Sequence, residues 1–303
     1  MHRQNRITNF SIDLLKRVLT MCKDGYYFIG KIKPEQCLQS RTKSSKYKPV
    51  YYIFEERNAL FIIIRGSQSI SDAYTDLDID EFTNLQGHSF HSGFYRAAYD
   101  IFEESYDIVS THDLIYVSGH SLGGSVATVL HYFLCTTFPN KDINTIAYDP
   151  APSVADNVFD DHMQSKLATI IYRHEIVSSL SCSNVHSRIK WADPILSRLN
   201  PNMIYSVTRF CTGWIPIGRS LFDTIENASH TISSALRDEA NGQSRSVKHV
   251  QGCIYRITGE QQRTLEELRI DPKTLKWNFW NPIAYLDHLP YTGEYILDGI
   301  EED

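Results

Sequence analysis

Long apolar segments are absent from the sequence, and so is a leader pattern at its start. No run approaches the roughly 20 consecutive apolar residues of a membrane-spanning helix. Residues 1–20 have neither a continuous apolar core nor a small-residue cleavage site, so they do not match a secretory signal. We therefore expect a cytoplasmic protein whose only membrane contact would be peripheral.

Cysteine and positive charge are also in short supply. The six cysteines are scattered, without a C-x-x-C pair or any other spacing typical of metal ligands. We therefore expect reduced thiols and no metal site. The 30 Lys and Arg are outnumbered by 36 Asp and Glu, which gives a net charge of −6. This acidic balance gives no reason to expect a nucleic-acid partner.

The positive charge that is present gathers near the N-terminus. Residues 1–50 contain eleven Lys and Arg but three Asp and Glu. Over residues 10–22 apolar side chains recur at helical spacing with basic ones opposite, which predicts an amphipathic helix. We expect residues 1–48 to form a basic arm that packs on the body of the protein, with its polar part at 39–48 as a surface loop. Contact of this arm with anionic lipid is the second interpretation.

Residues 49–303 show the alternation of strand and helix patterns that is typical of a single α/β domain. Two apolar runs separated by four polar residues predict a hairpin. Four later apolar runs alternate with helical patterns, which predicts a mostly parallel central sheet with helices on both faces. The predicted strands are 50–54, 59–64, 114–117, 143–148, 167–172 and 253–257. Residues 181–250, where Trp and Pro interrupt the alternation, are expected to be a cap-like insertion.

A G-x-S-x-G pattern lies between the predicted strand at 114–117 and a helical segment that begins with small residues. It consists of Gly119, Ser121 and Gly123 with one residue between each pair. A nucleophile elbow holds its serine on a strained turn, where glycines let the strand and the helix approach each other. The helix that follows directs its N-terminal N–H groups towards the place where an oxyanion develops. The pattern therefore predicts a serine hydrolase with Ser121 as its nucleophile.

Four motifs, in this order along the chain, resemble those of the class 3 lipase family, the fungal-lipase-like and diacylglycerol-lipase-like α/β hydrolases. They are RGSQSISD at 65–72, GHSLGG at 119–124, Glu175-Ile176-Val177, and DHLPY at 287–291. The resemblance covers residues 50–180 and 250–295. It implies the α/β-hydrolase fold for the chain.

The resemblance also implies partners for the serine. A neutral imidazole has to take the proton of the hydroxyl, and a carboxylate has to fix the tautomer of that imidazole. The matching motifs make Glu175 the acid and His288 the base, in the chain order of α/β hydrolases. The family's acid is normally Asp, so Asp149 after the preceding strand and Asp193 in the insertion stay open as alternatives.

In the family, two backbone N–H groups bind the oxyanion. Here they would be those of Leu122 and Ser67, with the Ser67 hydroxyl assisting. The resemblance further implies a lid directly after Ser67, whose polar composition favours an esterase-like, weakly interfacial lid. The lid candidates are Ile70, Asp72, Tyr74 and Leu77.

Together these patterns predict a serine carboxylic-ester hydrolase. We expect a lipase that acts on acylglycerols or phospholipid acyl chains through an acyl-serine intermediate, without a metal or organic cofactor. Its partner would be a lipid or other ester small molecule, with membrane contact through the basic arm or the 181–250 insertion. A thioesterase or acyltransferase of the same fold is the first alternative. The second is a hydrolase-like lipid- or partner-binding protein without turnover, motivated by Glu175 in place of Asp and Ala73 in place of the family's Trp.

Overall fold

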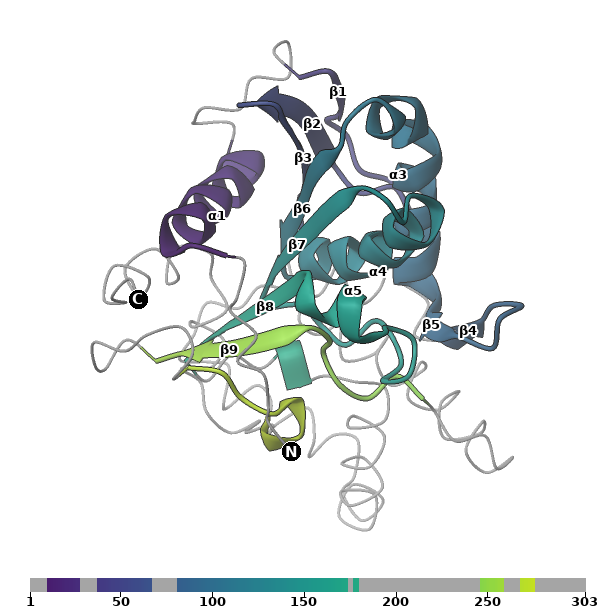
Figure 1. Cartoon of the computed structure of the whole chain (residues 1–303), viewed down its shortest axis with the longest axis vertical. Helices are drawn as coiled ribbons and strands as arrows, with labels where there is room; N and C mark the ends of the chain where they lie inside the picture. The colour runs from purple at the N-terminus through teal and green to yellow at the C-terminus, as the bar shows by residue number, and fades with distance from the viewer. Residues whose placement is uncertain are drawn as a thin grey trace, which may run out of the picture.

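A seven-stranded sheet forms the centre of the structure (Figure 1). The computed structural model describes residues 10–27, 37–66, 81–173, 177–179, 246–258 and 268–275. The strands of the central sheet are, in spatial order, β1 (Gln39–Arg41), β2 (Tyr51–Glu56), β3 (Ala59–Ile64), β6 (Leu114–His120), β7 (Asp142–Tyr148), β8 (Leu167–Tyr172) and β9 (Cys253–Ile257). The pairs from β1 to β3 are antiparallel and those from β3 to β9 are parallel. The predicted mostly parallel sheet is confirmed.

The first two long strands form the predicted hairpin. Glu56 pairs with Ala59, so the turn consists of Arg57 and Asn58 alone. Both turn residues have positive φ, 53° and 61°, as a two-residue type I′ turn requires. Every residue of β3 is buried, which agrees with its apolar side chains on both faces and its place inside the sheet.

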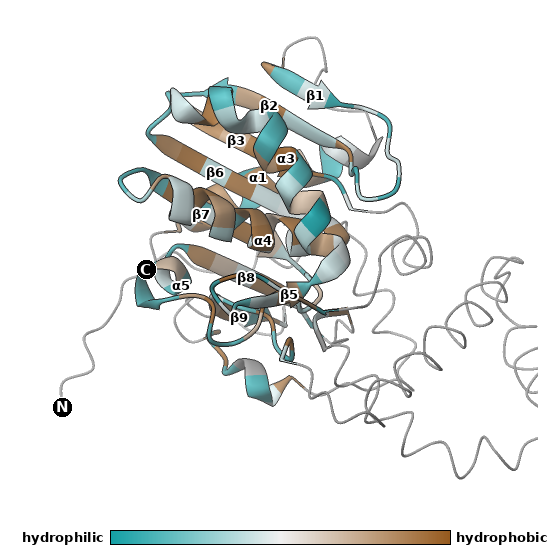
Figure 2. Ribbon diagram, turned by 90° about the vertical axis from the view of Figure 1, so that its right-hand side faces the viewer, coloured by the Kyte–Doolittle hydropathy of each residue, from teal (hydrophilic) through white to brown (hydrophobic). Residues whose placement is uncertain are grey.

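Helices cover both faces of the sheet. In Figure 1, α1 (Ile12–Tyr27) lies on one side, and α3 (Ser92–Ser110) and α4 (Leu122–Thr137) lie on the other. The short helix α5 (Asp161–Ser165) precedes β8. Figure 2 shows apolar residues along β3, β6 and β7 between these helix layers, and hydrophilic residues on α3. Among the helices that the structure describes, none is both long and apolar enough to cross a membrane.

The predicted amphipathic helix is α1, and its apolar side is buried against the sheet. Leu15, Val18 and Leu19 are at most 1% exposed and belong to one cluster with Phe61 and Ile63 of β3. The hydroxyl of Tyr148 in β7 donates a hydrogen bond to the carbonyl of Leu15 over 2.5 Å. The helix therefore contributes to the core with the same residues that its spacing marked as apolar.

One local expectation for the N-terminal part was wrong. Residues 39–48 were expected to be a surface loop, but Gln39–Arg41 form β1 and pair with β2. An edge strand has one side open to water, so it can be polar and lack the apolar run by which inner strands are recognised. The division into an arm at 1–48 and a domain at 49–303 stays a prediction.

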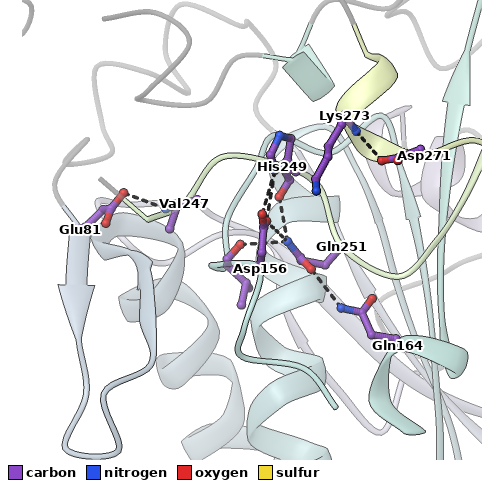
Figure 3. A network of polar contacts seen from close by, with 9 residues as sticks. Glu81, Asp156, Gln164, Val247, His249, Gln251, Asp271 and Lys273 are labelled. Carbon is purple, nitrogen blue, oxygen red and sulfur yellow. Dashed lines mark hydrogen bonds and ion pairs between the residues drawn. The ribbon is translucent and has the colours of Figure 1, made fainter. Parts of the chain in front are cut away.

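A second, two-stranded sheet holds the segment that leads into β9. It consists of β4 (Glu81–Thr83) and β5 (Ser89–His91), and β5 runs directly into α3. The carboxylate of Glu81 accepts hydrogen bonds from the backbone N–H of Ser246 over 2.8 Å and from that of Val247 over 2.9 Å, and Figure 3 shows the second of these. Most of the expected insertion, residues 181–245, lies outside the described residues.

Further polar contacts fix the approach to β9. Gln251 donates to the carboxylate of Asp156 over 3.0 Å and accepts from Gln164 over 3.0 Å (Figure 3). His249 lies 3.0 Å from the same Asp156 carboxylate. Two short 3₁₀ helices, η2 (Val177–Ser179) and η3 (Pro272–Thr274), complete the described elements.

Candidate active site

Ser121 lies at the junction between β6 and α4, at the carboxyl end of a parallel strand. Its backbone has φ 57° and ψ −126°, far from the conformations that serine normally adopts. The residue is 8% exposed. Such strain in a residue with a side chain is typical of functional sites, and this strand–turn–helix geometry is that of a nucleophile elbow.

The two outer glycines of the pattern are required by close backbone contacts. A Cβ atom on Gly119 would overlap the backbone of Gly123. A Cβ atom on Gly123 would overlap the carbonyl group of Ile64, the last residue of β3. The elbow is therefore packed between its own helix and the neighbouring strand, and only glycine fits at either position.

Hydrogen bonds tie the elbow to the sheet and to the loop after β7. The backbone N–H of Ser121 donates to the carbonyl of Tyr148 over 2.8 Å. One turn into α4, the Ser125 hydroxyl accepts from the backbone N–H of Ala151 over 2.9 Å and lies 3.1 Å from the carbonyl of the same residue. The start of α4 is therefore fixed to the carboxyl end of β7.

The predicted oxyanion donors can be placed in part. Leu122 is the first residue of α4, so its N–H is one of the donors that a helix leaves unpaired at its N-terminus. The helix dipole adds positive potential at the same end. Ser67 lies outside the described residues. Ile64 pairs in register with Gly119, so the chain that leads to Ser67 leaves β3 directly beside the elbow.

The acid and the base of the predicted triad lie outside the described residues, as do the lid candidates. These predicted residues are Glu175, His288, Ile70, Asp72, Tyr74 and Leu77, together with the alternative acid Asp193. Glu175 comes three residues after the end of β8, and one strand, β7, separates β8 from the nucleophile strand. His288 comes later in the chain than β9, the last strand among the described residues.

The alternative acid Asp149 lies within the described residues, and its side chain is near His120 of the elbow strand. It is 0% exposed and directly follows β7. Its Oδ1 accepts the backbone N–H of Tyr172 over 2.9 Å. Its Oδ2 is 3.9 Å from Nε2 of His120, the residue before the nucleophile, which is an ion-pair distance but too long for a hydrogen bond. From the sequence, Asp149 was predicted only as an alternative triad acid, and its contact with His120 was not predicted.

No metal site is found among the residues that the structure describes. Within them, no group of three or more His, Cys, Asp or Glu side chains is arranged to hold an ion. The described residues do place a strained serine at the N-terminus of a helix.

Comparison with known proteins gives matches to lipases. Residues 61–184 match the family described as lipase (class 3). The secreted alkaline triacylglycerol lipase of Penicillium cyclopium is 28% identical over 110 residues, which cover 32% of this chain and 39% of that protein. The chain therefore spans less than half the length of this curated relative.

Solved structures of fungal lipases are also similar. The triacylglyceride lipase of Rhizomucor miehei has a TM-score of 0.47 at 17% identity, over 56% of this chain and 74% of its own. The triacylglycerol lipase of Penicillium expansum has a TM-score of 0.47 at 20% identity, over 57% of this chain and 74% of its own.

The family match agrees with the resemblance inferred from the motifs, and the curated relative contradicts one prediction. The α/β-hydrolase fold expected from the sequence is present, with its elbow between β6 and α4. The expected cytoplasmic location is wrong, because the curated relative is a secreted enzyme. That expectation rested on a leader pattern missing from residues 1–20, and a missing pattern is weaker evidence than a matched secreted relative.

Proposed function

We propose that this chain, whose residues 61–184 belong to the class 3 lipase family, hydrolyses carboxylic esters of lipids through an acyl-serine intermediate on Ser121. The observation that carries the proposal is the backbone of Ser121, with φ 57° in a buried elbow at the N-terminus of α4. The substrates we propose are acylglycerols or phospholipid acyl chains.

The reaction follows from the roles of three side chains. The Oγ atom of Ser121 attacks the ester carbonyl carbon while its proton passes to His288. The negative charge on the carbonyl oxygen is stabilised by the N–H groups of Leu122 and Ser67. Collapse of this intermediate breaks the bond to the alcohol, which leaves with the proton from His288. Water then attacks the acyl-serine by the same route and releases the carboxylic acid.

We assign the acid to Glu175 because of the position of Asp149. An orienting carboxylate has to accept a hydrogen bond from the catalytic imidazole. One oxygen of Asp149 already accepts the N–H of Tyr172, and the other lies on the side of His120. Asp149 is also fully buried under the elbow. Glu175 follows β8, the next strand along the sheet, in the chain order expected for the acid.

We also propose how the protein would contact a membrane surface. The apolar side of α1 packs on the sheet, so it is not available for insertion into lipid. In addition, Arg17 forms an ion pair with Glu56, and Arg41 forms ion pairs with Asp100 and Glu104. Peripheral contact of the arm with anionic lipid would therefore be electrostatic and would not use the apolar side of α1. The insertion at 181–250 is the other proposed contact.

Kinetics of two serine variants test the proposed function. Ser121→Ala removes the hydroxyl in the elbow. Ser110→Ala makes the same change at the exposed end of α3 and is the control. We expect Ser121→Ala to lose at least about 10³-fold in hydrolysis of acylglycerols and soluble esters. Its melting temperature should stay within a few degrees, and Ser110→Ala should retain full activity. Activity of Ser121→Ala within about tenfold of wild type would contradict the assignment.

The same panel separates the alternatives. Thioester substrates and alcohol acceptors are added to the esters. Preference for thioesters, or transfer of the acyl group to an alcohol in water, would favour the thioesterase or acyltransferase. Absence of turnover on the whole panel would favour a binding protein without catalysis.

A further inference from the structure

Three neighbouring strands end in the same unusual way at the edge that carries the nucleophile. Ser121 after β6, Asp149 after β7 and Arg173 after β8 have φ values of 57°, 46° and 46°. None of them is glycine, although this region of backbone conformation favours glycine. Strain of this kind persists only where the surrounding structure enforces it. Three such residues on adjacent strands indicate one shared construction rather than three separate turns.

Backbone hydrogen bonds connect these bends from strand to strand. Ser121 donates its N–H to the carbonyl of Tyr148, which is the residue before Asp149. Asp149 donates its N–H to the carbonyl of Ile170 in β8, and Arg173 donates to the last residue of β9. All three bonds are 2.8 Å long. The position of each bend is thereby set by the next strand.

The side chain of Asp149 adds a second connection in both directions. Towards β8, its Oδ1 accepts a hydrogen bond from the backbone N–H of Tyr172. In a regular parallel pair, a backbone carbonyl of the neighbouring strand would accept this bond. Towards β6, its Oδ2 lies 3.9 Å from Nε2 of His120. Both the carboxylate and the imidazole are buried, at 0% and 2% exposure. Asp149 therefore contacts the residue before the nucleophile and the strand end that leads to Glu175.

A neutral amide at position 149 would satisfy the N–H of Tyr172 equally well. The negative charge of a carboxylate matters instead for the imidazole beside it, because a charge acts more strongly on a neighbouring polar group where water is excluded. We propose that Asp149 is a positioning residue for the hydrolytic reaction, which fixes the elbow of Ser121 by acting through His120. This inference rests on the proposed function, since it concerns the same reaction.

The main test compares two matched substitutions in β7 and its end. Asp149→Asn removes the charge but keeps an oxygen for the N–H of Tyr172. Asp142→Asn makes the same change at the amino end of the strand, where the side chain is half-exposed and pairs with Lys166. For Asp149→Asn we expect kcat on a soluble ester to fall roughly 10- to 100-fold with KM within about twofold, because a small displacement of a nucleophile has that effect. The rate of labelling by a fluorophosphonate should fall by the same factor, whereas Asp142→Asn should match wild type in both.

A double-mutant cycle tests the route through His120. His120→Leu alone should lower kcat by a factor similar to that of Asp149→Asn. The double variant should lose no more than about threefold beyond the more impaired single variant, because both changes break one contact. Losses that multiply would overturn the route through His120. If Asp149→Asn melts below the assay temperature, His120→Leu tests the same contact from the other side.

The remaining outcomes separate this inference from the proposed function. Wild-type turnover and labelling by Asp149→Asn would overturn the inference alone. A loss of about 10⁴-fold in Asp149→Asn, with Glu175→Gln unaffected, would make Asp149 the triad acid and also overturn it. If wild type itself neither turns over nor labels, the proposed function fails and the inference falls with it.

Discussion

His131 should make the stability of the fold depend on pH in a way that can be calculated. It lies in α4, the helix that begins at the elbow, and is 0% exposed. Its Nε2 is 3.1 Å from the carbonyl of Met163, which can only accept, so this nitrogen carries the hydrogen. Its Nδ1 is 2.9 Å from the hydroxyl of Thr145 and accepts from it. The neutral imidazole is therefore fully satisfied, and burial lowers the pKa of His131 to about 4.

The sign and size of the effect follow from proton linkage. Histidine in an unfolded chain has a pKa of about 6.5, so between pH 6.5 and 4 the unfolded chain binds a proton that the folded protein does not. The contribution of His131 to the free energy of unfolding is therefore complete above pH 7 and decreases as the pH falls. At about 1.36 kcal/mol per pKa unit, the total loss is about 3 kcal/mol, of which about 2 kcal/mol falls between pH 7 and 5.

Urea unfolding at pH 7, 6 and 5 measures this contribution. His131→Gln removes the titrating group while keeping an amide that can donate to Met163. The stability advantage of wild type over His131→Gln should shrink by about 2 kcal/mol from pH 7 to pH 5. Parallel curves for wild type and His131→Gln would refute a neutral, buried His131.

Three further predictions concern the elbow, the acid and the N-terminal helix. Gly123→Ala should lower both the melting temperature and ester turnover, because its Cβ would overlap the end of β3; wild-type values in both assays would contradict the packing of the elbow. Glu175→Gln should lose roughly 10³-fold or more in kcat while Asp193→Asn does not, and the reverse result would move the acid into the insertion. Tyr148→Phe should lower the free energy of unfolding in urea by about 1–2 kcal/mol, because its hydroxyl joins β7 to α1; an unchanged value would show that this bond is not stabilising.

Local patterns in the sequence were enough to predict the elbow and the inner strands. The glycines, the serine and the apolar run before them lie within ten residues, so one stretch of chain contains the evidence for Ser121. The inner strands could be predicted because burial on both faces makes them mostly apolar, as in β3 and β8, which are buried along their whole length. The edge strand β1 could not, since its polar residues look like those of a loop.

Contacts between strands could not be predicted, because they depend on register. His120 and Asp149 come together because His120 pairs with Tyr148 across β6 and β7. No periodicity within either strand determines that pairing. The state of His131 has the same origin, because its neutral form depends on Thr145 in β7 and Met163 in α5. For this reason Asp149 was identified in the sequence as a carboxylate after a strand but not as a neighbour of the elbow.

The central claim is that Ser121 is an activated nucleophile, and covalent labelling tests it most directly. The purified chain is treated with a fluorophosphonate ester, and the modified peptide is identified by mass spectrometry. We expect one adduct, on Ser121, that is lost in His288→Ala. Failure to label Ser121 under conditions that fully label a control esterase, with and without detergent, would contradict it.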